Sequence, residues 1–476
     1  MTVTGAIGAH DCGHERGHIT DSRFYGHAYA TDASRRIFCD VCRFQRWLDI
    51  EAALALSQAE LGMLAPEQAD RIAAAARVER LDLDRVRDEI RSTGHSLVAF
   101  LRALQAVCED DAGEFIHLGA TTQDIQDTGQ ALEMRDVLDE AERELAELVG
   151  VLAPLARHHA DTIMVGRSHA RAALPMTFGL KVAGWLDELL RHAERLDECR
   201  SRVVVAQLFG GVGTMAGFGD RGPALLDRFA ARLGLGVPDV CWHTARDRVS
   251  EYVMTLAALA ATLARILDEV RTLSRPEFGE LEEAWQPGKV GSSTMPHKRN
   301  PEECQQVVVL ARLAGAQVPL ALQAMTGEHE RDSRSLRLEW SMVADVSHHS
   351  LAALAISRRI LAGLIVHEEV MAANTEEAAG AVCSESLMLA LGSHLGKQSA
   401  HSHVYELCQD ATSRGLPLRE HLRAAPLLRA YLSDEELARI LDPMRYIGSA
   451  PELASATAER AERWLAERAP SARAAT

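Results

Sequence analysis

The chain has 476 residues, of which 47% are hydrophobic and only 5% are aromatic. Its formal net charge of −17 argues against nucleic acid or an anionic membrane as the main partner. The same charge is compatible with a small anionic substrate, because a cationic pocket can lie inside an acidic protein. Nine scattered cysteines favour a reducing cytoplasm over a disulfide framework. The N-terminus lacks the pattern of a secretory leader.

The N-terminal quarter of the chain reads as short helices behind a loose end. Residues 1–20 are polar and rich in Gly and His, which predicts a flexible tail. Residues 21–121 contain helical patterns broken by glycine and proline, which predict an N-terminal helical domain. One pattern, which we expect to form a single helix, contains Cys39 and Cys42. A lone C-x-x-C predicts two partly buried thiols rather than a metal site.

Residues 122–376 change character, because apolar side chains now recur at intervals of three, four and seven. This spacing predicts long helices, each with one apolar stripe. Helices of about 25 to 30 residues would run roughly 40 Å, and we expect their stripes to exceed what one subunit covers. We therefore predict a homotetramer, with an ordinary monomeric bundle as the alternative. The clearest stripes are Leu138, Leu145, Leu148, Leu152 and Leu155; Phe178, Val182, Trp185, Leu189, His192 and Leu196; and Tyr252, Leu256, Leu259, Leu263, Ile266, Val270 and Leu273.

Residues 377–476 return to shorter helical patterns, which predict a small C-terminal helical domain. We find no strand alternation and no internal repeat. The longest charge-free helical run, Tyr252–Ala264, is too short to cross a bilayer. The predicted fold class is therefore all-α, with three helical domains and a central long-helix bundle completed by tetramerisation.

The most informative stretch is residues 291–301, with the sequence G-S-S-T-M-P-H-K-R-N-P. Small residues at its start allow a flexible loop, and Pro301 is well suited to open the next helix. The loop offers a hydroxyl, an ammonium and an amide, groups that can take a proton and hold a carboxylate. A Gly-Ser stretch is usually a linker, but so many specified positions indicate a functional loop.

This loop resembles the signature of the fumarase/aspartase superfamily, which includes fumarase, aspartase, argininosuccinate lyase, adenylosuccinate lyase and 3-carboxymuconate cycloisomerase. Two further segments resemble that family in the expected order. Residues 117–128 begin H-L-G-A-T-T-Q-D, and residues 166–179 begin G-R-S-H. The resemblance covers most of the chain, from about Arg23 to Pro451.

The resemblance implies a β-elimination from a substituted succinate. A weakly acidic proton beside a carboxylate is removed, and an aci-carboxylate intermediate forms. In the family the first loop serine is the base, which implies this role for Ser292. A serine alkoxide becomes feasible when the loop closes, excludes water and surrounds the oxygen with backbone donors. His169 matches the candidate proton donor to the leaving group.

The other matched residues are expected to bind a small dicarboxylate substrate. The resemblance implies that the three segments come from three subunits, so that active sites are shared within the tetramer. We expect no metal and no other cofactor. The predicted substrate-binding residues are Thr121, Thr122, Gln123, Ser168, Lys298, Asn300 and His95, the last in the segment where adenylosuccinate lyases carry an active-site histidine.

Two branches of the family resemble the chain most. Residues 242–248, W-H-T-A-R-D-R, resemble the 3-carboxymuconate cycloisomerase branch, whereas residues 329–332, H-E-R-D, resemble adenylosuccinate lyase. The latter enzyme continues to a Glu-Arg pair that helps to bind a nucleotide phosphate. Here that pair is Glu339-Trp340, and losing the arginine disfavours a nucleotide. The cycloisomerase branch shares Glu-Trp but lacks Arg334 and Arg337.

Gln305 departs from the family in a way that bears on the leaving group. The family usually places a glutamate here, where it pairs with the catalytic histidine. A neutral amide can orient His169 but cannot raise its pKa as a carboxylate would. Such a site suits a leaving group that departs as a stable anion, so we predict nitrosuccinate as substrate, with fumarate and nitrous acid as products. Glu302 or Glu303 could supply the missing carboxylate.

Other activities remain as alternatives. The chain could be a 3-carboxy-cis,cis-muconate cycloisomerase or an adenylosuccinate-type C–N lyase. An alternative of another class is a non-catalytic protein, because some superfamily members serve as lens crystallins. The intact set of Ser292, Lys298, Asn300 and His169 favours an enzyme.

Overall fold

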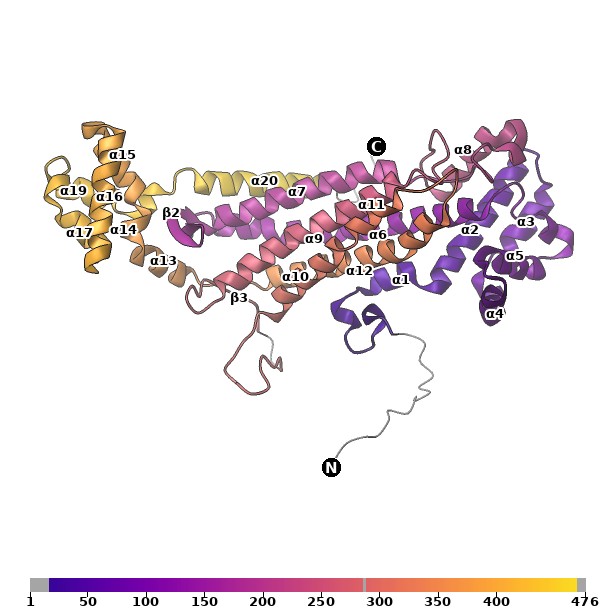
Figure 1. The fold of residues 1–476 in the computed structure, drawn as a ribbon, viewed down its shortest axis with the longest axis horizontal. Helices are drawn as coiled ribbons and strands as arrows, with labels where there is room; N and C mark the ends of the chain where they lie inside the picture. Colours follow the sequence, from indigo (N-terminus) through magenta and orange to yellow (C-terminus); the bar gives the residue numbers. More distant parts are fainter. Residues whose placement is uncertain (1–16, 286–287, 469–476) are drawn as a thin grey trace, which may run out of the picture. The chain divides into compact units, whose positions relative to one another are not determined.

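The computed structural model describes residues 17–285 and 288–468. Helices make up nearly all of the regular secondary structure of these residues, so the all-α prediction is confirmed (Figure 1). They pack into two compact units. Unit 1 contains the chain up to Arg143 and the segments Glu194–Ala261 and Val309–Ala355; unit 2 contains Glu144–Ala193, Thr262–Val308 and the chain from Ile356 onward. Several helices contribute residues to both units: α6 (Thr122–His158), α7 (Phe178–Val203), α9 (Asp247–Leu273), α10 (Glu302–Gly315) and α12 (Ser333–Ala362).

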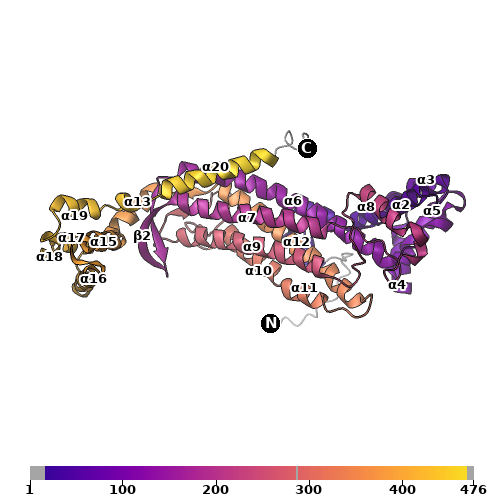
Figure 2. The same cartoon turned by 90° about the horizontal axis from the view of Figure 1, so that it is seen from above.

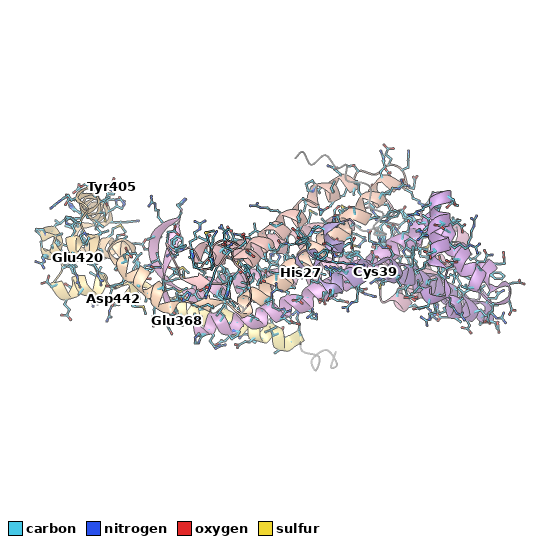
Figure 3. All side chains as sticks on the ribbon, turned by 90° about the horizontal axis from the view of Figure 1, so that it is seen from below. His27, Cys39, Glu368, Tyr405, Glu420 and Asp442 are labelled. Carbon is cyan, nitrogen blue, oxygen red and sulfur yellow. The ribbon has the colours of Figure 1, made fainter. Side chains whose placement is uncertain are left out.

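The N-terminal helices of unit 1 follow the predicted short patterns, with one correction. Cys39 adopts an extended backbone and ends α1, and its sulfur accepts a hydrogen bond from the amide of Cys42 at 3.3 Å. The expected single helix is therefore two, because the Cys39 thiol caps the second one (Figure 3 labels Cys39). The helices are α1 (Asp32–Phe38), α2 (Asp40–Glu60), α3 (Pro66–Ala75), α4 (Leu83–Thr93) and α5 (Ser96–Val107), followed later in unit 1 by α8 (Gly222–Leu233) and α11 (Val318–Ala324).

The predicted tail is only partly described. Residues 1–16 lie outside the described residues. Ile19–Asp21 forms the 3₁₀ turn η1, in which Thr20 is buried. The division into a tail and three domains with boundaries at residues 121 and 376 stays a prediction.

The apolar stripes of the long helices are buried within the single chain. Almost every predicted stripe residue is buried, and only Leu155 is partly exposed. The stripes therefore leave no continuous apolar surface for a subunit interface, because the chain covers them itself. Exposed apolar side chains on the long helices lie outside these stripes and include Met254 on α9 and Val309 on α10. The tetramer prediction thus rests on the family resemblance and not on the stripes.

Unit 2 contains a β-hairpin that the sequence analysis missed. Strand β1 (Ile163–Ser168) pairs antiparallel with β2 (Arg171–Thr177), with an irregularity between Val165 and Arg167. A second, minimal pair joins β3 (Leu281–Glu282) to β4 (Ile365–Val366). These short strands were not predicted from the sequence, in which no alternation was found. The side chains of β1 and β2 do not alternate strictly between buried and exposed, and their turn has none of the usual hairpin residues.

Unit 2 ends in a series of C-terminal helices, of which those between Ala379 and Ile440 pack around an apolar core that also includes Val165 of β1. The last of them, α20, runs along α7 in both views (Figures 1 and 2). Arg157 of α6 donates to Glu462 of α20 at 2.7 Å, and Arg460 pairs with Asp187 of α7. The helices are α13 (Glu368–Glu377), α14 (Ala379–Val382), α15 (Ser384–Leu395), α16 (Lys397–Arg414), α17 (Leu418–Ala424), α18 (Pro426–Arg429), α19 (Asp434–Ile440) and α20 (Ala450–Arg468).

One described stretch, Glu302–Ala324, is long and apolar enough to cross a membrane by length and composition alone. It comprises α10 and α11, which are separate helices, and 33% of its most apolar window is buried. A core helix of a soluble protein passes the same test.

Candidate active site

A cavity of about 440 Å³ in unit 1 brings together three of the predicted substrate-binding residues. They are His95 at the start of α5 and Thr122 and Gln123 at the start of α6. The first turns of α12 and the residues before it form the opposite wall. A cavity of this volume is in the range of small-molecule sites. It is lined by Gly94, His95, Ser96, Thr122, Gln123, Gln126, Arg331, Ser333, Leu336, Arg337 and Trp340.

Both the nitrogen and the oxygen of the Gln123 side-chain amide make hydrogen bonds within the chain. Its nitrogen donates to Asp127 at 3.1 Å and to the carbonyl of His243 at 2.9 Å. Its oxygen accepts from Nε of Arg331 at 3.2 Å, and Nη1 of Arg331 donates to Thr121 at 2.7 Å. Thr121 and Gln123 thus orient a guanidinium on the cavity wall, whereas the sequence analysis gave them only a carboxylate-binding role.

A buried charge network lies beneath Gln123. Arg246 donates to both oxygens of Asp127, at 2.9 and 3.0 Å, and to Glu339 at 2.7 Å. Gln130 also donates to Glu339, at 2.9 Å. Burial would lower the pKa of Arg246, but the two facing carboxylates outweigh it and raise the pKa. Because all three charged side chains are almost fully buried, this network fixes the first turns of α6, α9 and α12 against one another.

A second buried pair fixes the start of α6. Asp124 accepts the backbone amides of Phe209 and Gly210 at 3.0 and 2.9 Å, and it bonds the His243 ring at 3.0 Å. Burial alone would lower the pKa of His243, but hydrogen bonds to Asp124 and Cys241 outweigh it and raise the pKa to about 9. His243 is therefore a buried cation at neutral pH, paired with a carboxylate.

His95 has a structural bond as well as its place on the cavity wall. It is the N-cap of α5, and its Nδ1 accepts the backbone amide of Val98 at 3.3 Å. A ring nitrogen that accepts from a backbone amide is unprotonated. The Nε2 of His95 is then the nitrogen that carries the hydrogen and can donate to a ligand.

His169 lies at the tip of the β1–β2 hairpin in unit 2. Ser168 pairs with Arg171, so His169 and Ala170 form a two-residue loop, with φ of 49° and 61°. Left-handed backbone is unfavourable for residues other than glycine and costs about 1–2 kcal/mol at each position. Such strain is typical of functional sites. The His169 side chain is exposed at the tip of the hairpin. The predicted role of His169 as proton donor remains a prediction.

The hairpin is anchored at the strand that carries Ser168. Arg167 donates to both carboxylate oxygens of Glu280, at 2.6 and 2.9 Å, and lies 4.6 Å from the centre of the Phe278 ring. Asn374 completes the bonds of Glu280 at 2.9 Å. This bidentate pair with a buried carboxylate holds β1 two residues before His169, which is itself exposed at the tip.

The signature loop in unit 2 supplies backbone donors to its serine. The Ser292 oxygen accepts the amide of Met295 at 3.0 Å and that of Thr294 at 3.3 Å. These bonds stabilise negative charge on the oxygen, as a serine base requires. Asn300 donates to the carbonyl of Gly291 at 2.6 Å and so closes the loop on itself. A Cβ on Gly291 would lie 2.2 Å from the Lys298 carbonyl, so only glycine fits there.

The base of the loop is held more firmly than its tip. Trp285 lies between two cations, with Arg299 at 5.4 Å and Lys289 at 5.7 Å from its ring centre. Glu282 accepts from Arg299 at 3.0 Å. At the tip, Lys298 is exposed and makes no side-chain hydrogen bond among the described residues of unit 2. Nor do Ser168 and His169 share a hydrogen bond with the described loop, so these predicted site residues are not joined within the chain.

Gln305 is exposed on the first turn of α10. Of its two acidic neighbours, Glu303 pairs with Arg359 at 3.3 Å, whereas Glu302 is exposed at the helix start. Glu303 is therefore engaged elsewhere, and Glu302 is the remaining carboxylate at this helix end.

One group in unit 2 has the donors to hold a divalent metal ion. The ligand atoms of His158, His159 and Glu368 all lie within 4.8 Å of one another. Nδ1 of His159 also bonds Thr162 at 3.1 Å. Glu368 stands at the start of α13 and is labelled in Figure 3. None of these three belongs to the predicted catalytic segments.

Sequence reasoning missed the cavity wall formed by α12. It treated Arg331, Arg337 and Trp340 only as marks of one branch or another of the family. Arg331 lies 208 residues from Gln123 in the chain, so their contact leaves no local signal. The arginines around the start of α12 were the available hint, because cations near a helix N-terminus oppose the helix dipole unless a partner or ligand offsets them.

Comparison with known proteins adds an independent line of evidence. A family model described as Lyase matches residues 27–318, and one described as Adenylosuccinate lyase C-terminus matches residues 380–457. The chain is 38% identical to N-acetyl-S-(2-succino)cysteine lyase of Dickeya dadantii, over 91% of this chain and 96% of that relative. It is 36% identical to adenylosuccinate lyase of Methanothermobacter thermautotrophicus, over 92% and 98% respectively. The solved structure of 3-carboxy-cis,cis-muconate lactonizing enzyme from Pseudomonas putida matches with a TM-score of 0.85 and 34% identity, over 93% of this chain and 100% of that chain.

Proposed function

The chain belongs to the fumarase/aspartase superfamily of lyases, and from this premise we propose that it converts nitrosuccinate to fumarate and nitrite. The observation that supports this proposal is which side chains lie on the first turn of α10, directly after the signature loop. Gln305 stands where the family usually has a carboxylate for its catalytic histidine, and Glu303 is bound to Arg359. A weak acid–base relay suits a leaving group that departs as an anion without a proton.

The proposed reaction uses groups that this chain supplies. Ser292, stabilised by two backbone amides, takes a proton from the carbon beside one carboxylate. The electron pair of that C–H bond first enlarges the charge on the carboxylate, which Lys298 and Asn300 bind. It then forms the carbon–carbon double bond, while the pair of the C–N bond leaves with nitrogen as nitrite. The proton remains on the base, so atoms and charge balance.

A direct assay tests this proposal. Purified protein with nitrosuccinate should release fumarate, followed by the absorbance of its conjugated double bond, and nitrite in equal amount. A panel of amino-, purinyl- and carboxymuconate-type substrates should react more slowly. If an amine or a purine is eliminated faster than nitrite, that group is the natural leaving group. If no substrate of the panel reacts, the proposal is contradicted.

A second candidate is elimination of a thiol from a 2-succinylated thiol. It is favoured by the 38% identity to a relative named N-acetyl-S-(2-succino)cysteine lyase. A thiolate also departs as an anion, so the argument from Gln305 applies to it equally. The same assay decides between the two when N-acetyl-S-(2-succino)cysteine is included, because a free thiol is released in place of nitrite.

Assembly and location belong to the same proposal. We infer a cytoplasmic homotetramer in which the Thr121–Gln123, Ser168–His169 and Ser292–Asn300 segments of different subunits complete each site. Light scattering should give four times the chain mass of 51.9 kDa. Full activity in a monomer would contradict shared active sites.

A further inference from the structure

We propose that the cavity against α12 is the subsite for the leaving group, that it recognises a planar group with two acceptor oxygens, and that Arg337 and Trp340 determine which leaving group is accepted. This inference rests on the proposed function, because it concerns the same substrate. Nitro and carboxylate groups share this planar geometry, and a guanidinium fork binds either with two parallel hydrogen bonds. Two substrates supply such a planar group: nitrosuccinate through its nitro group, and a cysteine-type thiol substrate through its carboxylate.

At one end of the cavity, the side-chain amide of Gln123 has all its hydrogen-bonding groups engaged within the chain. Both N–H bonds of the Gln123 amide are directed to Asp127 and the His243 carbonyl, so the amide has no hydrogen left for a ligand. Its oxygen is directed to Arg331. The positive group at this end of the cavity is therefore Arg331 itself. Its Nη2 makes no hydrogen bond among the described residues of unit 1, which leaves that nitrogen available to a ligand.

A second cation, Arg337, lies further along the chain on α12 and also lines the cavity. Arg337 lines the cavity and makes neither an ion pair nor a side-chain hydrogen bond with the described residues of its unit. It shares one helix face with Ser333 and Trp340, at spacings of four and three residues. An arginine without a partner, in a cavity that already holds Arg331, predicts an anionic or electron-withdrawing ligand.

Arg334 shows that this is not a property of every arginine on α12. It donates to Asp332 from Nε at 3.0 Å and from Nη2 at 2.6 Å, and it lies 3.3 Å from Glu328. Its charge is thus neutralised within the chain, and it does not line the cavity. Arg334 and Arg337 are both exposed and lie on the same helix. Only Arg334 has a partner within the chain, which makes it a matched control.

Trp340 gives the cavity a flat apolar wall beside these cations. A planar nitro or carboxylate group can lie against an indole while its oxygens meet a guanidinium in the same plane. The indole stands where adenylosuccinate lyase has its phosphate-binding arginine, so that one phosphate contact is replaced here by an apolar surface. The wall thereby favours small planar leaving groups.

The two sources of the planar group predict different kinetics. A nitro group is neutral in bound nitrosuccinate and gains its negative charge only as the C–N bond breaks. Arg337 then stabilises the transition state more than the bound substrate and should act on kcat. The carboxylate of a cysteine-type leaving group is charged from the start and lies away from the breaking bond. Arg337 then contributes to binding and should act on KM.

The test compares Arg337→Gln with Arg334→Gln in the full-length protein. For nitrosuccinate, we expect Arg337→Gln to lower kcat roughly tenfold to hundredfold with little change in KM, as for loss of a charge-assisted hydrogen bond. For N-acetyl-S-(2-succino)cysteine, it should raise KM by a similar factor with kcat nearly unchanged. The carboxamide of that thiol substrate should lose this sensitivity. Arg334→Gln should match the wild type throughout.

Two results overturn the inference. One is an Arg337→Gln variant that is indistinguishable from Arg334→Gln with every substrate. The other is equal sensitivity of the carboxylate and carboxamide thiol substrates, together with no effect on kcat for nitrosuccinate. Calorimetric binding of the thiol substrate to a Ser292→Ala protein separates the subsite from the reaction. Binding that Arg337→Gln weakens, without turnover in the wild type, supports the subsite while the proposed reaction fails.

Discussion

The floor of the unit 1 cavity and the signature loop of unit 2 carry residues of the same predicted site but are built in opposite ways. Beneath the cavity, Arg246 is buried between two carboxylates, each with further hydrogen bonds. The loop has two amide contacts to Ser292, one closing bond from Asn300 and an exposed Lys298. The cavity wall is thus preorganised by its own chain, whereas the loop tip has most of its bonding capacity left for substrate or another subunit.

The contrast between a preorganised cavity wall and an open loop would be wrong if the buried Arg246–Asp127–Glu339 network contributed little to the free energy of unfolding. Arg246→Met leaves Asp127 and Glu339 as unpaired buried charges, so the free energy of unfolding should fall by about 3–5 kcal/mol. Urea denaturation measures the change. As a control, Arg334→Met removes an exposed pair and should cost less than about 1 kcal/mol. Equal losses in the two variants would remove the distinction between floor and surface.

The loop should behave in the reverse manner, with a large effect on rate and little on stability. Ser292→Ala should lower the rate at least about a thousandfold while leaving the protein folded, because it removes the base. Ser293→Ala is the neighbouring control, since Ser293 is exposed. Steady-state kinetics and circular dichroism report the two quantities. A Ser292→Ala protein with a tenth of wild-type activity would take the base role from this residue.

The second buried pair of the floor predicts a pH dependence with a definite sign. The pKa of His243 is raised to about 9 in the folded chain, from an ordinary value of 6.5. Its contribution, roughly 3 kcal/mol for such a shift, is fully present below pH 6.5 and lost as pH rises through 9. Unfolding measured between these pH values should show the wild type losing more stability than His243→Gln. Parallel pH profiles would mean that His243 is not charged in the folded protein.

The smallest expected effect is at the hairpin tip. If nitrite leaves without a proton, His169→Ala should lower turnover of nitrosuccinate less than about tenfold, and Gln305→Glu should bring little gain. A general acid would contribute about a hundredfold or more. The two variants are assayed beside each other with nitrosuccinate and an amino-substituted succinate. A severe loss for His169→Ala, with the amine as the better wild-type substrate, would contradict nitrite as the leaving group.

Periodicity predicted what depends on local pattern. The stripe of Tyr252 to Leu273 forms a buried helix face, as its spacing predicted. The hairpin escaped detection because its turn is Ser-His-Ala-Arg, and left-handed backbone at His169 and Ala170 has no sequence signature outside glycine and asparagine. The helix break at Cys39 escaped for a similar reason, since cysteine is an uncommon cap.

For the candidate site as well, local sequence patterns predicted some features and missed others. The three motif segments were recognisable as strings of residues, so Thr121, His169 and Ser292 were named from sequence. The partners that orient them are distant in the chain, such as Arg331 for Gln123. Arg334 is neutralised by Asp332 and Glu328, two and six residues before it in the chain, whereas no described residue of unit 1 pairs with Arg337.

Trp340 has a practical consequence as an optical probe. It is 41% exposed and lines the cavity, whereas Trp47, Trp185 and Trp242 are buried, at 7%, 2% and 2%. Nitro compounds quench indole emission on contact, so nitrosuccinate in the cavity should dim one fluorophore while leaving the buried ones bright. Occupancy of this site would then be visible in milliseconds, before any product forms, and the light lost would report how long the nitro group stays beside the ring.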